Sequence, residues 1–138
     1  MIKAVFDTNV FISALCAPKG VCAGVFTNYN RNRYELVISE TILCELLYVG
    51  LRKYFRKYFE VYSLYEFIEK IKVGSILIEN QSITKVDRAL TNDIKDLPIL
   101  NTFLSSNADY LVTGNKKHFC INPSKLLSPH GFLHMILK

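Results

Sequence analysis

The sequence predicts an α/β fold, a three-layer α/β/α sandwich with a mostly parallel central sheet. Short apolar runs alternate along the chain with longer segments of helical periodicity, an order typical of strands joined by crossover helices. Two of these runs, residues 2–6 and 110–113, deliver oxygen-bearing side chains at their carboxyl ends, where ligands of parallel sheets bind. The chain shows no repeat or low-complexity tract, and 138 residues suffice to bury a core, so we expect a single domain over residues 1–138.

Each expected element in the first half of the chain has an identifiable boundary. The expected strands are residues 2–6 and 36–38, and the expected helices are residues 9–15, 21–30 and 40–51. Pro18 and Gly20 separate the first two helices, because both residues interrupt regular structure. Ser39 precedes the third helix and is a typical N-cap.

The second half of the chain continues the alternation. The expected strands are residues 74–78, 110–113 and 125–127, and the expected helices are residues 62–72, a segment opened by Asp96, and residues 129–138. Pro98 lies in the first turn of the helix after Asp96, and Ser128 with Pro129 forms a capping start for the last helix. Residues 79–93 are polar, and the sequence predicts no definite element there.

Composition argues against several classes of protein. Lys and Arg outnumber Asp and Glu by 17 − 12 = 5, a mild bias toward polyanions such as nucleic acid. The four cysteines are scattered without a CxxC pair, no cationic apolar leader precedes the first strand, and no apolar run approaches the length of a membrane span. We therefore expect a cytoplasmic protein with reduced thiols, without disulfides, secretion or a membrane partner.

Asp7 is the most informative residue of the sequence. A carboxylate that closes a buried strand is costly unless something positive lies beside it, so Asp7 is interpreted as half of a metal site. Thr8 and Asn9 can cap the following turn and hold the carboxylate in place, which gives Asn9 a supporting role. A plain N-cap is an equally good explanation of this motif taken alone.

Two further acids could face the same edge of the sheet. Glu45 lies at the border of the apolar stripe of its helix and could point toward Asp7, although such a residue alone is more often solvated. Asp96 comes directly before an apolar helix that fixes its position. Asp93 and Asp96 bracket this helix start, so at least one of them is expected to be a cap, and capping alone would also explain Asp96.

Asn115 is the fourth candidate ligand and follows the strand at residues 110–113. Thr113 offers a supporting hydroxyl at the sheet edge, Gly114 allows close backbone approach, and Asn115 supplies a neutral carbonyl oxygen. The competing interpretation is a turn asparagine in the left-handed conformation. Oxygen ligands with few imidazoles or thiolates nearby select Mg²⁺ or Mn²⁺ over zinc.

Five segments together carry a family resemblance. They are residues 5–15 (VFDTNVFISAL), 39–46 (SETILCEL), 95–100 (KDLPIL), 108–114 (ADYLVTG) and 127–133 (LSPHGFL). In this order they resemble the PIN domain family, and specifically its branch of toxin components of toxin–antitoxin systems. The first four look like the family's four motifs and the fifth like its ending, so the resemblance spans nearly the whole chain.

The resemblance implies a PIN-like fold and a metal-dependent endoribonuclease that hydrolyses RNA phosphodiester bonds and leaves a 5′-phosphate. Carried over by position, Asp7 and Asp96 would ligate Mg²⁺ or Mn²⁺, and Glu45 would ligate directly or through water. The family also implies a cognate antitoxin and a homodimer as partners.

Asn115 departs from the family pattern, which usually has aspartate there. A carboxylate about 4 Å from a divalent ion contributes on the order of 8 kcal/mol of gross attraction at an effective dielectric constant of about 20, much of it offset by desolvation. Two hypotheses follow: a nuclease that retains three acids, or a PIN-fold module that binds RNA or a protein with weak or no catalysis. Asp109 is no substitute, since it precedes its strand and is expected at the opposite sheet edge.

Two basic segments are candidates for contact with RNA. In residues 52–59 (RKYFRKYF), Arg52 and Lys53 could follow the RNA backbone while tyrosines stack on bases. The favoured alternative is that these rings pack inward or against a second subunit. Lys116 and Lys117, beside the proposed pocket, could contact phosphate. In an unbroken helix, four tyrosines would share one face: Tyr54, Tyr58, Tyr62 and Tyr65.

Other chemistries receive little support. No G-x-S-x-G elbow appears, which argues against a serine or cysteine nucleophile with a histidine base. An aspartyl phosphatase could also place Asp7 after the first strand, but Thr8 and Asn9 provide no second acid two residues later. The three histidines show no ligand spacing with each other and are assigned no role: His118, His130 and His134.

Overall fold

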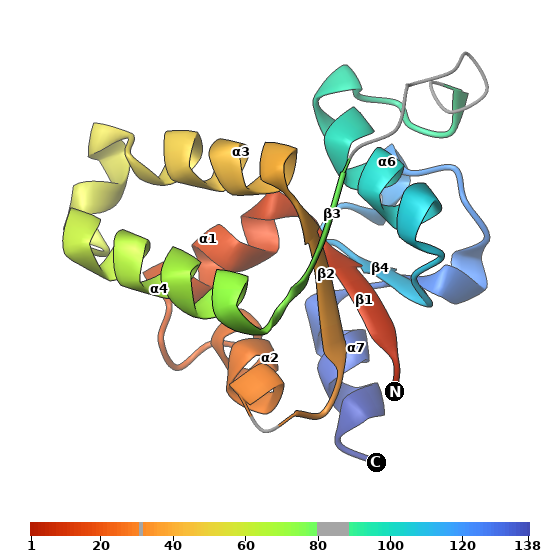
Figure 1. Ribbon diagram of the computed structural model, residues 1–138, viewed down its shortest axis with the longest axis horizontal. Helices are drawn as coiled ribbons and strands as arrows, with labels where there is room; N and C mark the ends of the chain where they lie inside the picture. The colour runs from red at the N-terminus through yellow and green to blue at the C-terminus, as the bar shows by residue number, and fades with distance from the viewer. Residues whose placement is uncertain (31, 80–88) are drawn as a thin grey trace.

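The computed structural model describes residues 1–30, 32–79 and 89–138, and its centre is a five-stranded sheet whose neighbouring strands are all parallel (Figure 1). The strands are β1 (Lys3–Phe6), β2 (Glu35–Ser39), β3 (Ile76–Ile78), β4 (Tyr110–Val112) and β5 (Leu126–Leu127), in the order β3-β2-β1-β4-β5. The predicted α/β fold on a mostly parallel sheet is confirmed. Because the chain builds from β1 first toward β3 and then toward β5, the order reverses between β1 and β4, the usual ligand position in such sheets.

Helices cover both faces of this sheet. The described α-helices are α1 (Thr8–Cys16), α2 (Val21–Asn30), α3 (Glu40–Gly50), α4 (Val61–Gly74), α6 (Leu97–Ser106) and α7 (Pro129–Ile136). Helix α6 packs on β1 and β2, and in Figure 1 it lies on the side of the sheet opposite α1, α2 and α4. Among the described residues, no single helix has the length and hydropathy of a membrane span, and α1 and α2 reach them only as a pair bent by 104°.

Several connections are 3₁₀ turns that the sequence did not predict. They are η1 (Lys53–Lys57), η2 (Ile94–Asp96), η3 (Lys116–His118) and η4 (Pro123–Lys125). Predicted element ends differ from the observed ones by a few residues, and the last helix ends at Ile136 instead of Lys138. Residues 80–88, within the segment for which the sequence predicted no element, lie outside the described residues.

An aromatic cluster anchors the carboxyl end of β1. The ring of Phe6 has centroid distances of 5.8, 5.5, 5.7 and 5.6 Å to those of Phe11, Phe26, Tyr34 and Phe132. Phe6 itself is 1% exposed, and such closely packed ring pairs stabilise beyond their buried area. The cluster therefore fixes the backbone position of the residue that follows, Asp7.

Ser39 ties α3 to α6 at the end of β2. Its hydroxyl accepts the backbone N–H of Ile42 at 3.3 Å, which is the predicted N-cap of α3. The same oxygen accepts a hydrogen bond from the Thr102 hydroxyl of α6 at 3.0 Å. The helix that carries Glu45 and the helix that Asp96 precedes are thereby fixed to one strand end.

Replacing Gly50 with alanine is expected to destabilise the protein by about 1–2 kcal/mol. A Cβ at Gly50 would lie 2.7 Å from both Cδ atoms and 3.3 Å from the Cγ atom of Leu64, which is fully buried, so the packing of α3 against α4 must shift. Overpacking of this kind costs about 1–3 kcal/mol, more than the gain of up to about 1 kcal/mol in helix propensity. Urea denaturation measures the change. Gly114→Ala is the control, because a Cβ there meets nothing within 4 Å, and equal stability of both variants would contradict the prediction.

Candidate metal centre at the carboxyl edge of the sheet

Asp7 and Thr113 face each other because β1 and β4 are paired in register. Phe6 pairs with Val112, so the residues that follow these strands are adjacent, and the Asp7 N–H donates to the Val112 carbonyl at 2.9 Å. The Thr113 hydroxyl donates to Asp7 Oδ2 at 2.8 Å, and the Asn9 N–H donates to Asp7 Oδ1 at 3.3 Å. Asp7 is only 6% exposed. It is therefore the N-cap of α1 and a buried, oriented carboxylate, so capping does not exclude ligation.

Glu45 shares a cavity of about 200 Å³ with Asp7 and Asp96. Burial raises the pKa of the Glu45 carboxyl, and the Asp7 carboxylate raises it further. Asp96 adds to this effect, whereas the Thr8 hydroxyl and the Arg52 guanidinium lower the pKa of Glu45. The structure thus brings together the three acids that the sequence selected from remote segments.

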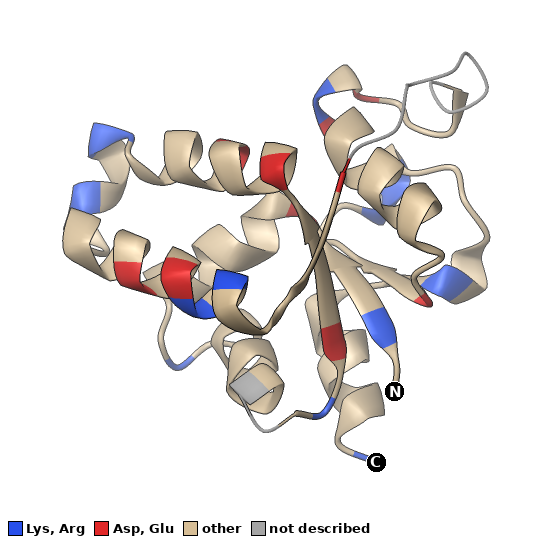
Figure 2. Ribbon diagram, in the orientation of Figure 1, with Lys and Arg blue, Asp and Glu red and all other residues tan. Residues whose placement is uncertain are grey.

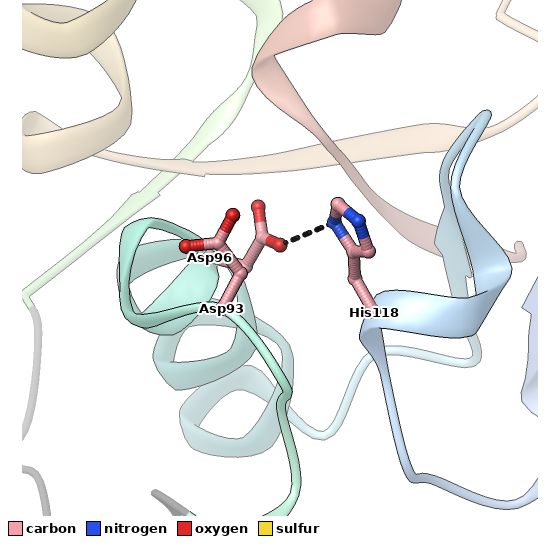
Figure 3. A group of neighbouring side chains, drawn as sticks. All are labelled: Asp93, Asp96 and His118. Carbon is pink, nitrogen blue, oxygen red and sulfur yellow. Dashed lines mark hydrogen bonds and ion pairs between the residues drawn. The ribbon is translucent and has the colours of Figure 1, made fainter.

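Asp96 keeps its carboxylate available because a neighbour caps the helix start. Asp93 Oδ1 accepts the Lys95 N–H at 3.0 Å, whereas the Asp96 side chain makes no capping hydrogen bond. His118 Nδ1 lies 2.9 Å from Asp96 Oδ2 (Figure 3), and since an ionised carboxylate only accepts, this nitrogen donates. Burial and then Asp7 raise the pKa of Asp96, while His118 lowers it.

His118 and Asp93 are site residues that the sequence reasoning missed. His118 lies in η3, and Figure 3 shows its ring reaching across to the two acids of the η2 turn. Ligand atoms of Asp93, Asp96 and His118 all lie within 4.8 Å of one another. The spacing between the histidines gave no indication of a site. The positions of Asp93 just before the third motif and of His118 just after the fourth could have identified these two residues as neighbours of the site.

Asn115 lines the cavity and is exposed to solvent. Its backbone N–H donates to the Thr113 hydroxyl at 3.0 Å, and its side chain makes no capping hydrogen bond. Its φ of −129° excludes the left-handed turn conformation that the sequence left open. No described glycine, Gly114 included, has a positive φ, so this turn does not depend on glycine's conformational freedom.

The predicted phosphate-binding cations take different positions. Arg52 lines the cavity, and Lys95, which the sequence analysis did not select, lines it as well. Lys53, Lys116 and Lys117 are exposed and do not line it. Asp109, as expected, is at the opposite edge, where its Oδ2 accepts the Lys3 N–H at 2.9 Å.

The donor set fits a hard divalent cation. Four acids and two permanent cations line the cavity, so its formal charge without His118 is 2 − 4 = −2 in a chain whose net charge is +5. The buried Thr8 hydroxyl lines the cavity and interacts with the Glu45 carboxyl, so it adds a neutral oxygen beside the acids. Carboxylate, amide and hydroxyl oxygens are the ligands that Mg²⁺ and Mn²⁺ prefer.

Comparisons with known proteins agree with this architecture. The family model described as PIN domain matches residues 3–117. A solved structure of VapBC2 from Rickettsia felis, bound to a DNA fragment from its promoter, is similar with a TM-score of 0.59 and 18% identity, over 92% of this chain and 97% of that chain. No curated protein matches this sequence. Since the family model covers most of the sequence, this chain belongs to the PIN domain family.

Proposed function

We propose that this protein is a metal-dependent endoribonuclease that hydrolyses RNA phosphodiester bonds as the toxin component of a toxin–antitoxin system. The observation that carries the proposal is the convergence of Asp7, Glu45 and Asp96 on one cavity, where their negative charges oppose one another. His118 and Arg52 offset this repulsion only in part, since the pKa values of Glu45 and Asp96 remain raised, and a divalent cation would offset it further. PIN domain membership supports the nuclease assignment.

The residues of the cavity divide into ligands and residues that orient them. Asp7, Glu45 and Asp96 would hold Mg²⁺ or Mn²⁺, and the Asn115 amide oxygen is a neutral fourth donor. A divalent ion supplies a water of lowered pKa and neutralises charge on the phosphate. Thr113 and Asn9 hold the Asp7 carboxylate in position. These hydrogen bonds keep the ligand oriented before any ion or RNA binds.

Basic residues would place the RNA against the acids. Arg52 and Lys95 reach the cavity and can pair with the phosphates on either side of the scissile bond. Lys116 and Lys117 follow Asn115 directly in η3 and are exposed, which suits contacts with the next phosphates along the strand. The cationic side chains therefore offset the repulsion between RNA and the four acids.

The partners follow from the family and from the similar structure. The PIN-domain toxins that this chain resembles act with an antitoxin, and the similarity to VapBC2, solved bound to a DNA fragment from its promoter, supports a cognate antitoxin as the partner of this chain. We further propose a homodimer and a cytoplasmic location, where RNA and an antitoxin would both be available. Co-purification with the product of a neighbouring gene tests the antitoxin, and sedimentation tests the dimer.

A binding module without catalysis is the second candidate function. Asn115, in place of an acid, favours it, because a neutral donor contributes less to metal affinity than a carboxylate. Titration of Mn²⁺ by calorimetry together with RNA cleavage separates the two. Saturable binding and Mn²⁺-dependent cleavage support the nuclease, whereas no binding at millimolar Mn²⁺ overturns it.

Substituting Asn115 with aspartate is expected to tighten Mn²⁺ binding roughly tenfold, because a further carboxylate attracts the ion more strongly than an amide does. The backbone hydrogen bond to Thr113 is retained, and the side chain has no capping bond to lose. Calorimetry measures the affinity. Asn122→Asp adds the same charge at the N-cap of η4, outside the cavity, and should leave the affinity unchanged. Equal affinity of Asn115→Asp and the native protein would place residue 115 outside the metal site.

A further inference from the structure

A second hollow, which we call the tyrosine groove, lies between α1 and η1 beside the carboxylate cavity. It has a volume of about 440 Å³, and its walls include Ser13 and Cys16 of α1 together with Tyr54 and Tyr58. Asn9 lines both this groove and the carboxylate cavity. The two hollows therefore meet at Asn9, and a strand bound at the acids can continue into the groove.

The tyrosine rings of the groove are exposed, whereas the adjacent phenylalanines pack inward. Tyr54 is 59% exposed and Tyr58 is 47% exposed. Phe59 is 7% exposed, and the half-buried Phe55 stacks on it with a centroid distance of 5.7 Å. Phe59 thus packs inward, while Phe55 also lines the groove. The Tyr54 and Tyr58 rings contact each other with centroids 5.8 Å apart, and each keeps exposed ring surface on which a base can stack.

Cations lie directly beside these rings. Lys57 Nζ lies 4.1 Å from the Tyr54 ring centroid and 5.4 Å from that of Tyr58. The Arg52 guanidinium carbon lies 5.7 Å from the exposed Tyr48 ring, and Arg52 also lines the carboxylate cavity. Figure 2 shows Lys and Arg gathered on the segment that joins α3 to α4. Rings beside cations suit nucleotides, since the base can stack while the phosphate pairs with the charge.

The charge of the groove favours a polyanion over an acidic or neutral protein segment. No acidic side chain belongs to its lining in the part of the chain that the structure describes. The cations above it would attract phosphates, and the groove opens toward a cavity that we assign to a phosphodiester. Bases of a duplex are stacked within the helix and are not available to such rings.

We infer that the tyrosine groove binds unpaired nucleotides that flank the scissile phosphodiester, with bases stacked on Tyr54 and Tyr58 and the backbone beside Lys57 and Arg52. This inference rests on the proposed nuclease function and extends it, because it adds a subsite outside the metal centre. The groove then holds a single strand in place for the acids and discriminates against paired RNA.

Binding without catalysis tests the groove. Fluorescence anisotropy is measured in EDTA with a labelled single-stranded RNA of about ten nucleotides, long enough to reach the groove. The double variant Tyr54→Ala/Tyr58→Ala should bind about 10- to 100-fold more weakly, since stacking on each ring is lost. The double variant Tyr54→Phe/Tyr58→Phe keeps both rings and should bind within about twofold of the native protein.

Two other exposed tyrosines provide the matched control. Tyr62 and Tyr65 of α4 are 74% and 48% exposed and do not line the groove, so their double alanine variant should bind RNA as the native protein does. Circular dichroism should show the native fold in every variant, because the replaced rings are largely exposed. A duplex of the same length should bind more weakly than the single strand and without dependence on Tyr54 or Tyr58.

Several results would overturn the inference. One is unchanged RNA affinity in the Tyr54→Ala/Tyr58→Ala variant, and another is an equal loss of RNA affinity in the Tyr62→Ala/Tyr65→Ala control. A third is a Tyr54→Ala/Tyr58→Ala variant that changes only its self-association in sedimentation, which would make this face a contact between two copies of the chain. Cleavage assays with Mn²⁺ separate this from the proposed function. If RNA binding depends on Tyr54 and Tyr58 but the protein does not cleave RNA, the groove is supported and the proposed nuclease is overturned. If the protein cleaves RNA but binding does not depend on these tyrosines, the nuclease is supported and the groove is overturned.

Discussion

Replacing Asp7 with asparagine is expected to abolish metal-dependent RNA cleavage while making the metal-free protein more stable. Removing a hydrogen-bond partner of a metal ligand typically costs 10- to 100-fold, so loss of the ligand itself should cost at least about 100-fold in metal affinity or activity. Stability should rise because Asp7 is a cause of the raised pKa of both Glu45 and Asp96, and asparagine removes that repulsion. Asparagine is as good an N-cap as aspartate, because its one oxygen can accept from the Asn9 N–H as Asp7 Oδ1 does. Its NH2 group then replaces Oδ2 and can donate to the Thr113 hydroxyl oxygen.

Thermal unfolding in EDTA and cleavage in Mn²⁺ measure the two effects on the same preparation. Asp109→Asn is the matched control, because it removes the same charge at the opposite edge and retains the acceptor for the Lys3 N–H. The control should show native activity and no gain in stability from relieved repulsion at the cavity. A fully active Asp7→Asn variant, or one that is less stable than the native protein in EDTA, would contradict the charge repulsion argued here.

Divalent metal is expected to stabilise the protein strongly, and more so at neutral than at acidic pH. Free Mn²⁺ at about 100 times its Kd adds about 2.7 kcal/mol to the free energy of unfolding, or roughly 5–10 °C in Tm for a chain of this size. The pKa values of Glu45 and Asp96 are raised in the folded state. At pH values between the ordinary carboxyl pKa and these raised pKa values, the folded protein therefore binds more protons than the unfolded chain. In EDTA, these two groups therefore make stability fall as pH rises from about 4, the ordinary carboxyl value, through the raised pKa values. Mn²⁺ needs the deprotonated acids, so its effect grows over the same interval.

Scanning calorimetry at pH 5 and pH 7, with EDTA or with Mn²⁺, tests this linkage. The Tm increase caused by Mn²⁺ should be larger at pH 7. Glu45→Gln removes one of the two raised groups, and its stability in EDTA should fall less between these pH values than that of the native protein. An equal Mn²⁺ shift at both pH values would show that the acids of the cavity are not the ligands.

Local sequence signals were sufficient to predict the strands and the residues that follow them. Asp7 and Thr113 each come directly after a short apolar run, and parallel pairing puts such residues at one edge whatever the rest of the chain does. Ser39 and Ser128 are caps of the helices that follow them, as predicted, because such a capping bond spans only four consecutive residues. Strand ends and caps are local signals, whereas the pairing that brings Asp7 and Thr113 together is a tertiary contact.

Other features of the site depend on tertiary structure and could not be predicted from local sequence. His118 reaches Asp96 across 22 residues of sequence, a contact that no spacing rule contains. The choice between Asp93 and Asp96 as cap depended on the η2 turn, which leaves the Asp96 oxygens unbonded to the backbone. Tyr54 and Tyr58 would share a face with the tyrosines of α4 only in an unbroken helix, and the structure has no such helix, because η1 ends at Lys57 and α4 begins at Val61. The break points the phenylalanines inward, so the alternative in which the rings pack inward holds for Phe55 and Phe59 only.

The pairing of β1 with β4 has a consequence for when the activity can arise. The hydrogen bond between Thr113 and Asp7 joins residues separated by 106 positions, and Asp96 and His118 also come late in the chain. A ribosome that has released only the first half of the polypeptide therefore exposes Asp7 and Glu45 without their partners. Long-range closure of this kind is slow, which delays assembly of the complete ligand set until after synthesis of residues 110–118. The nuclease that we propose would therefore not cleave the RNA of the translation machinery while the chain is still being synthesised.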